Sequence, residues 1–74
     1  MVQTFSLSNG FAAGYDFETT FESAVNECLK SSRMMNTRNW LHVRTGGKWV
    51  EIGYTVKVAP MTWEFIQNVE LSNI

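Results

Sequence analysis

The chain has 74 residues, enough for one domain with a single small hydrophobic core. Its hydrophobic content of 45% and charged content of 18% exclude an intrinsically disordered chain, and its formal net charge of -1 is unlike the positive charge typical of nucleic-acid-binding domains. One Cys and one His exclude an internal disulfide and supply too few ligands for zinc. We therefore expect one α+β domain over residues 1–74, without a metal or cofactor.

Neither a secretory signal nor a membrane span is recognisable in the sequence. The first residues, MVQTFSLSNGF, lack the positive charge and the long apolar run of a signal peptide. Nowhere do apolar residues continue for the roughly 18 positions that cross a bilayer. We expect a cytoplasmic protein, where the unpaired thiol of Cys28 would stay reduced.

The N-terminal residues predict a strand followed by a turn. In VQTFSLS, Phe5 and Leu7 alternate with polar residues, so both side chains are expected to face the core. The pair Asn9-Gly10 is typical of hairpin turns. The following FAAGYDF, residues 11–17, either forms a second strand of a hairpin or folds back over the sheet.

The clearest helix pattern is TTFESAVNECLKSSR, residues 19–33. Its apolar residues repeat with the helical period and form one stripe of Phe21, Ala24, Val25, Cys28 and Leu29. Thr19 and Glu22 have the spacing of a capping box, and Asp16 is a competing N-cap. Polar residues after the stripe predict an end near Arg33.

A hairpin is predicted in NWLHVRTGGKWVEIGYTVKV, residues 39–58, because Gly46-Gly47 accepts the positive φ angles of a two-residue turn. The register pairs Thr45 with Lys48, Arg44 with Trp49, Val43 with Val50, His42 with Glu51, Leu41 with Ile52, and Trp40 with Gly53. Alternation then assigns to the core Leu41, Val43, Val50, Ile52, Tyr54, Val56 and Val58. It assigns to the other face Arg38, Trp40, His42, Arg44, Trp49, Glu51, Gly53, Thr55 and Lys57.

The C-terminal TWEFIQNVELS also alternates, with apolar residues at Trp63, Phe65, Val69 and Leu71. This pattern predicts a strand, and a short helix using Trp63, Ile66 and Val69 is the alternative. Together the elements predict an α+β fold in the order β(β)αβββ. One amphipathic helix would pack on one face of an antiparallel sheet of four to five strands.

The candidate binding surface is basic and aromatic. Residues 1–29 carry a charge of -4, residues 30–48 carry +5 and residues 49–74 carry -2. The helix dipole explains Lys30 and Arg33 but not the cations beyond the predicted helix. We expect partner binding through Arg38, Trp40, His42, Arg44, Lys48, Trp49 and Lys57. Trp and Arg anchor protein interfaces, and they also bind single-stranded nucleic acid by stacking and phosphate contacts.

The same residues have a purely structural explanation. Trp40 would cover the gap left by Gly53 across the strand, and Arg44 would form a cation–π pair with Trp49 worth about 0.5–1 kcal/mol. His42 opposite Glu51 would be an ordinary cross-strand charge pair. The sequence supports both interpretations equally, since two Trp residues on one nominally polar face can also mark a binding surface.

A second candidate surface is acidic and lies around the start of the helix. It consists of Asp16, Glu18, Glu22 and Glu27. Acidic residues in a first helical turn are common in any solvated helix, which explains them without a partner. A basic site of a partner protein is the ligand that this surface would accept.

Catalysis is not expected. Cys28 lies on the apolar stripe of the helix, where a thiol is a core residue with a raised pKa, and no feature places His42 beside it. We predict a small non-enzymatic protein-binding module that acts as an inhibitor or adaptor by occupying a partner's surface, with phage and mobile-element accessory proteins as an expected setting. The alternatives are a single-stranded nucleic-acid-binding domain and a homodimer formed through an edge strand.

Overall fold

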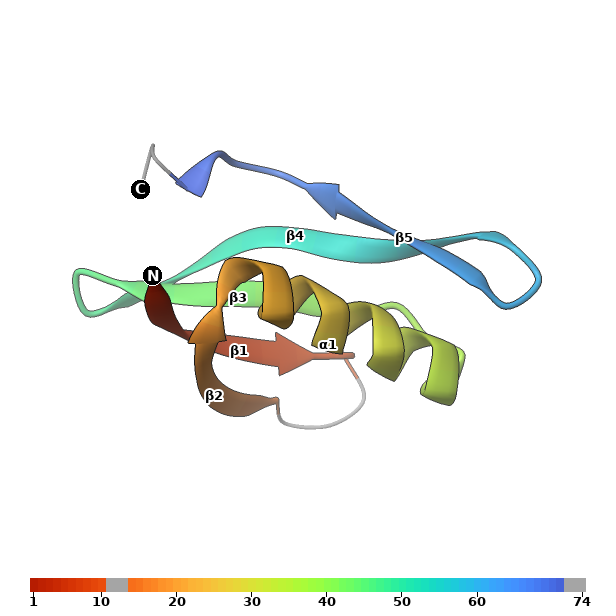
Figure 1. Ribbon diagram of the computed structural model, residues 1–74, viewed down its shortest axis with the longest axis horizontal. Helices are drawn as coiled ribbons and strands as arrows, with labels where there is room; N and C mark the ends of the chain where they lie inside the picture. Colours follow the sequence, from red (N-terminus) through yellow and green to blue (C-terminus); the bar gives the residue numbers. More distant parts are fainter. Residues whose placement is uncertain (11–13, 72–74) are drawn as a thin grey trace.

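One helix packs across one face of a five-stranded antiparallel sheet (Figure 1). The computed structural model describes residues 1–10 and 14–71. Its elements are β1 (Val2–Ser8), β2 (Tyr15–Thr20), α1 (Phe21–Met35), β3 (Trp40–Thr45), β4 (Lys48–Ala59) and β5 (Thr62–Gln67). The strands lie in the order β2-β1-β3-β4-β5, so β2 and β5 form the two edges. The α+β prediction is confirmed, with the optional second strand present.

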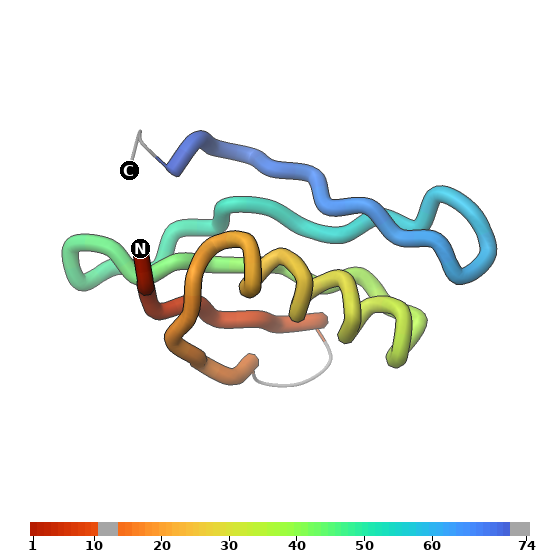
Figure 2. The backbone as a smooth tube through the Cα atoms, in the orientation of Figure 1, coloured from red at the N-terminus to blue at the C-terminus, as the bar shows by residue number. Residues whose placement is uncertain are grey.

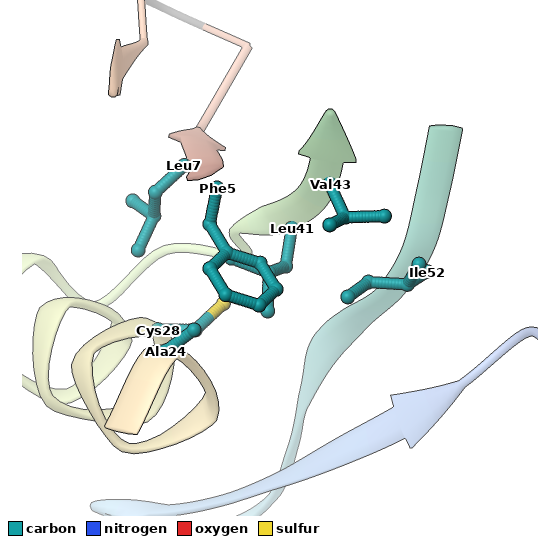
Figure 3. Close-up of a cluster of buried hydrophobic side chains, with 7 residues drawn as sticks. All are labelled: Phe5, Leu7, Ala24, Cys28, Leu41, Val43 and Ile52. Carbon is teal, nitrogen blue, oxygen red and sulfur yellow. The ribbon is translucent and has the colours of Figure 1, made fainter. Parts of the chain in front are cut away.

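The core lies between α1 and the face of the sheet that α1 covers, which we call the helix face. Its fully or almost fully buried apolar residues are Phe5, Leu7, Ala24, Cys28, Leu41, Val43 and Ile52 (Figure 3). Around them pack the partly buried Phe17, Phe21, Val25, Val50, Phe65, Val69 and Leu71. Two central strands and the predicted apolar stripe of the helix therefore supply most of the buried surface that stabilises the fold.

The helix begins and ends later than the sequence predicts. Its N-cap is Thr20, whose Oγ1 accepts a hydrogen bond from the backbone N–H of Ser23 at 3.3 Å. The prediction of Thr19 or Asp16 as the cap was wrong, because the pairing of β2 with β1 extends through Thr20. The helix continues past Arg33 to Met35 and ends at Asn36, which has the left-handed conformation that Asn tolerates at a C-cap.

The turn at Gly46-Gly47 and the adjacent register agree with the prediction. Both glycines have positive φ angles, and β3 pairs with β4 as predicted from Thr45–Lys48 back to His42–Glu51. A β-bulge then follows, because Leu41 faces Gly53 and Trp40 faces Tyr54. The predicted pairs of Leu41 with Ile52 and Trp40 with Gly53 were therefore wrong by one residue on β4.

Gly53 explains the position of this bulge. The ring of Phe65 lies so close to its Cα that a Cβ atom would collide with that ring and with the carbonyl oxygen of Ile66. Phe65 also packs edge-on against Phe21 of α1, with ring centroids 6.4 Å apart. A residue without a side chain is thus required where β4, β5 and the helix meet.

The bulge reverses the alternation of side chains along the rest of β4. Thr55 is buried on the helix face, while Tyr54 and Val56 lie on the opposite face and Val58 is 52% exposed. The predicted core positions of Tyr54, Val56 and Val58 were wrong, because a one-residue insertion exchanges the two faces of a strand. The predicted outward positions of Gly53, Thr55 and Lys57 were wrong for the same reason.

A buried polar cluster joins the helix to β4 beyond the bulge. Thr55 Oγ1 lies 2.6 Å from Ser32 Oγ and accepts a hydrogen bond from the backbone N–H of Asn39 at 2.9 Å. Asn39 Nδ2 donates to Cys28 O at 3.2 Å and to Ser32 Oγ at 3.0 Å. Ser32, Asn39 and Thr55 are fully buried, so these hydrogen bonds offset part of their desolvation. Among the described residues, the buried Asn39 Oδ1 has no hydrogen-bond partner. The hydrogen bonds of the cluster explain why the polar end of the helix remains helical.

The outer strands complete the sheet. The predicted hairpin between β1 and β2 is present, with Leu7 paired to Tyr15, but the connection is longer than a two-residue turn at Asn9-Gly10. Residues 11–13 of the predicted FAAGYDF strand lie outside the described residues. The tail forms the predicted strand, but the strand covers only Thr62–Gln67 and ends before Val69 and Leu71. Figure 2 shows the β3–β4 and β4–β5 hairpins pointing to opposite ends of the molecule.

The account of the bulge predicts that Gly53→Ala lowers the free energy of unfolding by about 1–3 kcal/mol, because Phe65 and the β5 backbone must move. Urea unfolding followed by circular dichroism measures this change. Val58→Ala, at an exposed position of the same strand, serves as the control and should change stability by less than about 0.5 kcal/mol. Equal stabilities of the two variants would contradict the account.

Thr55→Val keeps the shape of a buried side chain but removes the hydroxyl that accepts from Asn39 N–H. The expected cost is about 1–3 kcal/mol, because the N–H is left buried without its acceptor. The same substitution at exposed Thr62 is the matched control, and both are measured by the urea midpoint at constant m-value. A Thr55→Val midpoint at or above that of the native chain would refute a stabilising role for the cluster.

Candidate functional site

The open face is the surface of the sheet opposite α1. Alternation and the bulge place on it the side chains of Asp16, Glu18, Trp40, His42, Arg44, Trp49, Glu51, Tyr54, Val56, Glu64 and Ile66. Arg38, just before β3, joins them. Within residues 1–10 and 14–71, α1 is the only α-helix, and it packs on the other face. Five of the seven predicted partner-binding residues therefore lie on one continuous surface.

An apolar row crosses the middle of the open face. Trp40 of β3 is paired with Tyr54 of β4, and Tyr54 is paired with Ile66 of β5. Trp40 and Tyr54 are half-buried, and Ile66 is 40% exposed. A Cβ atom placed on Gly10 would lie 3.6 Å from Trp40 Cζ3, so the connection after β1 borders the row. The row therefore leaves part of its apolar surface accessible.

Two arginines lie over aromatic rings of this face. Arg38 Cζ is 5.1 Å from the centroid of the Tyr54 ring, and Arg44 Cζ is 5.3 Å from that of Trp49. The Arg44–Trp49 cation–π contact is the one predicted from the sequence. The Arg38–Tyr54 contact was missed, because Tyr54 was assigned to the core. Both pairs present a positive charge beside an exposed planar surface.

A polar row lies next to the apolar one. His42 of β3 is paired with Ser6 of β1 on one side and with Glu51 of β4 on the other. The pairing of His42 with Glu51 is the one predicted from the sequence. Glu51 Oε2 accepts a hydrogen bond from Asn68 Nδ2 at 2.5 Å. The Asn68 backbone N–H also donates to Ile52 O at 2.8 Å, which joins the end of β5 to the bulge.

The charge of the open face is mixed rather than basic. Its cations are Arg38 and Arg44, while its acidic side chains are Asp16, Glu18, Glu51 and Glu64. A surface that follows a phosphate backbone needs an excess of cations. The acidic residues on both sides of the arginines therefore favour a partner that carries charges of both signs.

Two predicted site residues lie away from this surface. Lys57 is on the helix face, where its Nζ donates to Asn36 Oδ1 at the helix C-cap at 2.8 Å. Its assignment to the same surface as Trp40 was wrong, because the bulge changes the alternation between Glu51 and Lys57. Lys48 lies at the tip of the β3–β4 hairpin, next to the Gly46-Gly47 turn.

The residues that sequence reasoning missed are Tyr54, Val56 and Ile66. A signal for them exists in the sequence, because a glycine inside a strand pattern often marks a bulge or a close backbone approach. Gly53 was assigned instead to a gap beneath Trp40. A bulge at Gly53 would have moved Tyr54 and Val56 to the open face.

The predicted acidic surface is divided between two elements. Asp16 and Glu18 project from the open-face side of the edge strand β2, while Glu22 and Glu27 are exposed on α1. Burial, and then the charge of Glu27, raise the pKa of Tyr15. Glu27 and Tyr15 therefore lie close enough to interact across the space between helix and strand.

The thiol of Cys28 is fully buried, and burial raises its pKa from 9.0 to about 12. It belongs to the core, as the helical stripe predicted. Among the described residues, no group of three or more His, Cys, Asp or Glu side chains is arranged to hold a metal ion. A search of the same residues found no helix with the length and apolar character needed to traverse a bilayer.

Comparison with known proteins gave no match to any family model, curated protein or solved structure.

The buried thiol should react at least roughly 100-fold more slowly with Ellman's reagent at pH 8 in the folded protein than in urea, because reaction requires opening of the core. The pKa of Cys28 is higher in the folded chain than in the unfolded chain. The free energy of unfolding should therefore fall as the pH rises from 9.0 toward 12. Stopped-flow absorbance measures the labelling rate. Similar rates with and without urea would contradict the burial of Cys28.

Proposed function

We propose that this chain is a small non-enzymatic protein-binding module that acts as an inhibitor or adaptor, and that the open face is its contact surface. The observation that carries the proposal is the apolar row of Trp40, Tyr54 and Ile66, with Arg38 over one of its rings. Aromatic residues and Arg at the centre of a surface, with charged residues at its rim, form the usual pattern of a protein interface.

The geometry of the row supports a rigid contact. Strand pairing fixes the backbones of all three residues, and cation–π contacts hold two arginines near the rings. Ordering such side chains on binding costs little conformational entropy, because they are already constrained. A flat partner surface with an apolar centre and charges of both signs at its rim is the expected complement.

The alternative is single-stranded nucleic acid stacked on Trp40, Trp49 and Tyr54. It is less favoured, because Asp16, Glu18, Glu51 and Glu64 share the face with only two arginines. Phosphate groups would approach these carboxylates without compensating cations. The proposed setting is the cytoplasm, in agreement with a reduced Cys28, and accessory proteins of phages or mobile elements are a typical context for such modules.

The test compares the native chain with the double variant Arg38→Ala and Trp49→Ala, which removes two exposed open-face side chains. The native chain is first used to capture a partner protein from a cell extract, and the partner is then purified. This partner should bind the native chain at least tenfold more tightly than it binds the variant. Isothermal titration measures both affinities, and circular dichroism checks that the variants remain folded.

A matched control removes one exposed cation and one exposed large apolar side chain elsewhere, through Arg33→Ala with Met61→Ala. This control should bind like the native chain. Equal affinity of the open-face variant would overturn the proposal. Micromolar binding of a single-stranded oligonucleotide that weakens steeply with salt, with no protein partner lost on mutation, would support the nucleic-acid alternative instead.

A further inference from the structure

A second surface lies at the opposite edge of the sheet from β5, where β2 has one neighbouring strand among the described residues. β2 pairs with β1 on one side, and its other side is the edge of the sheet. Alternate residues of an edge strand direct their backbone N–H and C=O groups outward. Another extended chain can therefore extend the sheet at this edge by forming main-chain hydrogen bonds.

A groove runs beside this edge, between β2 and α1. It consists of two adjoining hollows of about 390 and 290 Å³ that share Tyr15 and Glu27. The first is lined in addition by Phe17, Thr19, Ser23 and Asn26. The second is lined in addition by Lys30, Ser31, Met34 and Met35.

The walls of the groove are partly apolar. Phe17 and Tyr15 pack against each other with ring centroids 5.5 Å apart and ring planes tilted by 35°, and Tyr15 is 52% exposed. Met34 and Met35 are 75% and 62% exposed at the other wall. Large apolar side chains on a helix and on an edge strand thus face a space wide enough for inserted side chains. Methionine adapts readily to side chains of different shape.

The charges around the groove select a basic occupant. Asp16 and Glu18 project from β2 on the open-face side, and Glu22 and Glu27 are exposed on α1. Among the residues that line the groove, Lys30 balances the charge of Glu27. The excess negative charge therefore comes from Asp16, Glu18 and Glu22 beside the groove. A second copy of the chain is disfavoured, because pairing two β2 edges would bring their acidic side chains together.

We propose that β2 and the groove beside it bind an extended basic segment of a partner protein as an added strand. About five or six residues would pair with Tyr15–Thr20, given the six residues of β2. Alternate apolar side chains would enter the groove against Tyr15, Phe17 and the methionines. The intervening Lys or Arg side chains would face Asp16 and Glu18.

The test uses a fluorescein-labelled hexapeptide of alternating lysine and valine and the full chain. Fluorescence anisotropy should show saturable binding that weakens as salt is raised. A hexapeptide of the same composition with lysines and valines in separate blocks should bind at least fivefold more weakly. The alternating peptide with backbone N-methyl groups on every second residue should also lose at least fivefold, because methylation removes the strand hydrogen bonds.

Protein variants locate the site. Asp16→Asn with Glu18→Gln should weaken binding about tenfold, while Glu64→Gln with Glu70→Gln, at the other end of the sheet, should leave it unchanged. The open-face variant Arg38→Ala with Trp49→Ala should bind the peptide normally, so this inference and the proposed function fail independently.

Several results would overturn the inference. They are absence of saturable binding, equal binding of the N-methylated peptide, and insensitivity to the Asp16 and Glu18 substitutions. Light scattering provides a further check, because a dimer that disappears in the Asp16→Asn and Glu18→Gln variant would mean that a second copy occupies this edge.

Discussion

The β-bulge at Ile52 and Gly53 determines which side chains of β4 lie on each face of the sheet. Before it, the alternation set by the Gly46-Gly47 turn directs Trp49 and Glu51 away from the helix. After it, the alternation is reversed, and Tyr54 rather than Thr55 lies on the open face. A single extra residue therefore produces both the buried polar cluster and the apolar row on the open face.

Side-chain contacts on both faces of the sheet stabilise the bulge. On the helix face, Phe65 occupies the space that a side chain at residue 53 would need, and Thr55 hydrogen-bonds to Ser32 and Asn39. On the open face, Arg38 lies over Tyr54. An unbulged strand would bury the Tyr54 phenol near the helix and expose Thr55, so the hydroxyl cluster and the ring contact would be lost together.

Several features of the fold follow directly from the sequence, because local physical rules decide them. The helical stripe containing Ala24 and Cys28 is in the core, and Gly46-Gly47 forms the turn with the predicted adjacent register. The C-terminal strand could likewise be predicted from the alternation of apolar and polar residues. Such features depend on side-chain periodicity and on the φ angles that glycine permits, both of which act over a few neighbouring residues.

The remaining features depend on tertiary contacts. The position of the bulge depends on Phe65, which is far from Gly53 along the chain but adjacent across the sheet. The extension of the helix to Met35 depends on the burial of Ser32 beside Thr55 and Asn39. For the candidate site, Arg38, Trp40, His42, Arg44 and Trp49 were grouped correctly, whereas Lys57 was misplaced and Tyr54 was missed.

The centres of the two candidate surfaces lie on different parts of the sheet, and Asp16 and Glu18 belong to the rim of both. The apolar row crosses β3, β4 and β5, while the groove and its acidic residues lie at β2 and α1. Under the two proposals, one face of the sheet would contact a flat protein surface, and one edge would hold an extended basic segment. Neither contact needs the buried core to change, because the core lies between α1 and the sheet.

Nuclear Overhauser contacts across β3 and β4 test the central claim most directly, because paired residues in antiparallel strands have Cα atoms only about 4.5–5.5 Å apart. The account predicts backbone contacts of Trp40 with Tyr54 and of Leu41 with Gly53, together with His42 with Glu51. Contacts of Trp40 with Gly53 and of Leu41 with Ile52 would show an unbulged hairpin and would contradict the account.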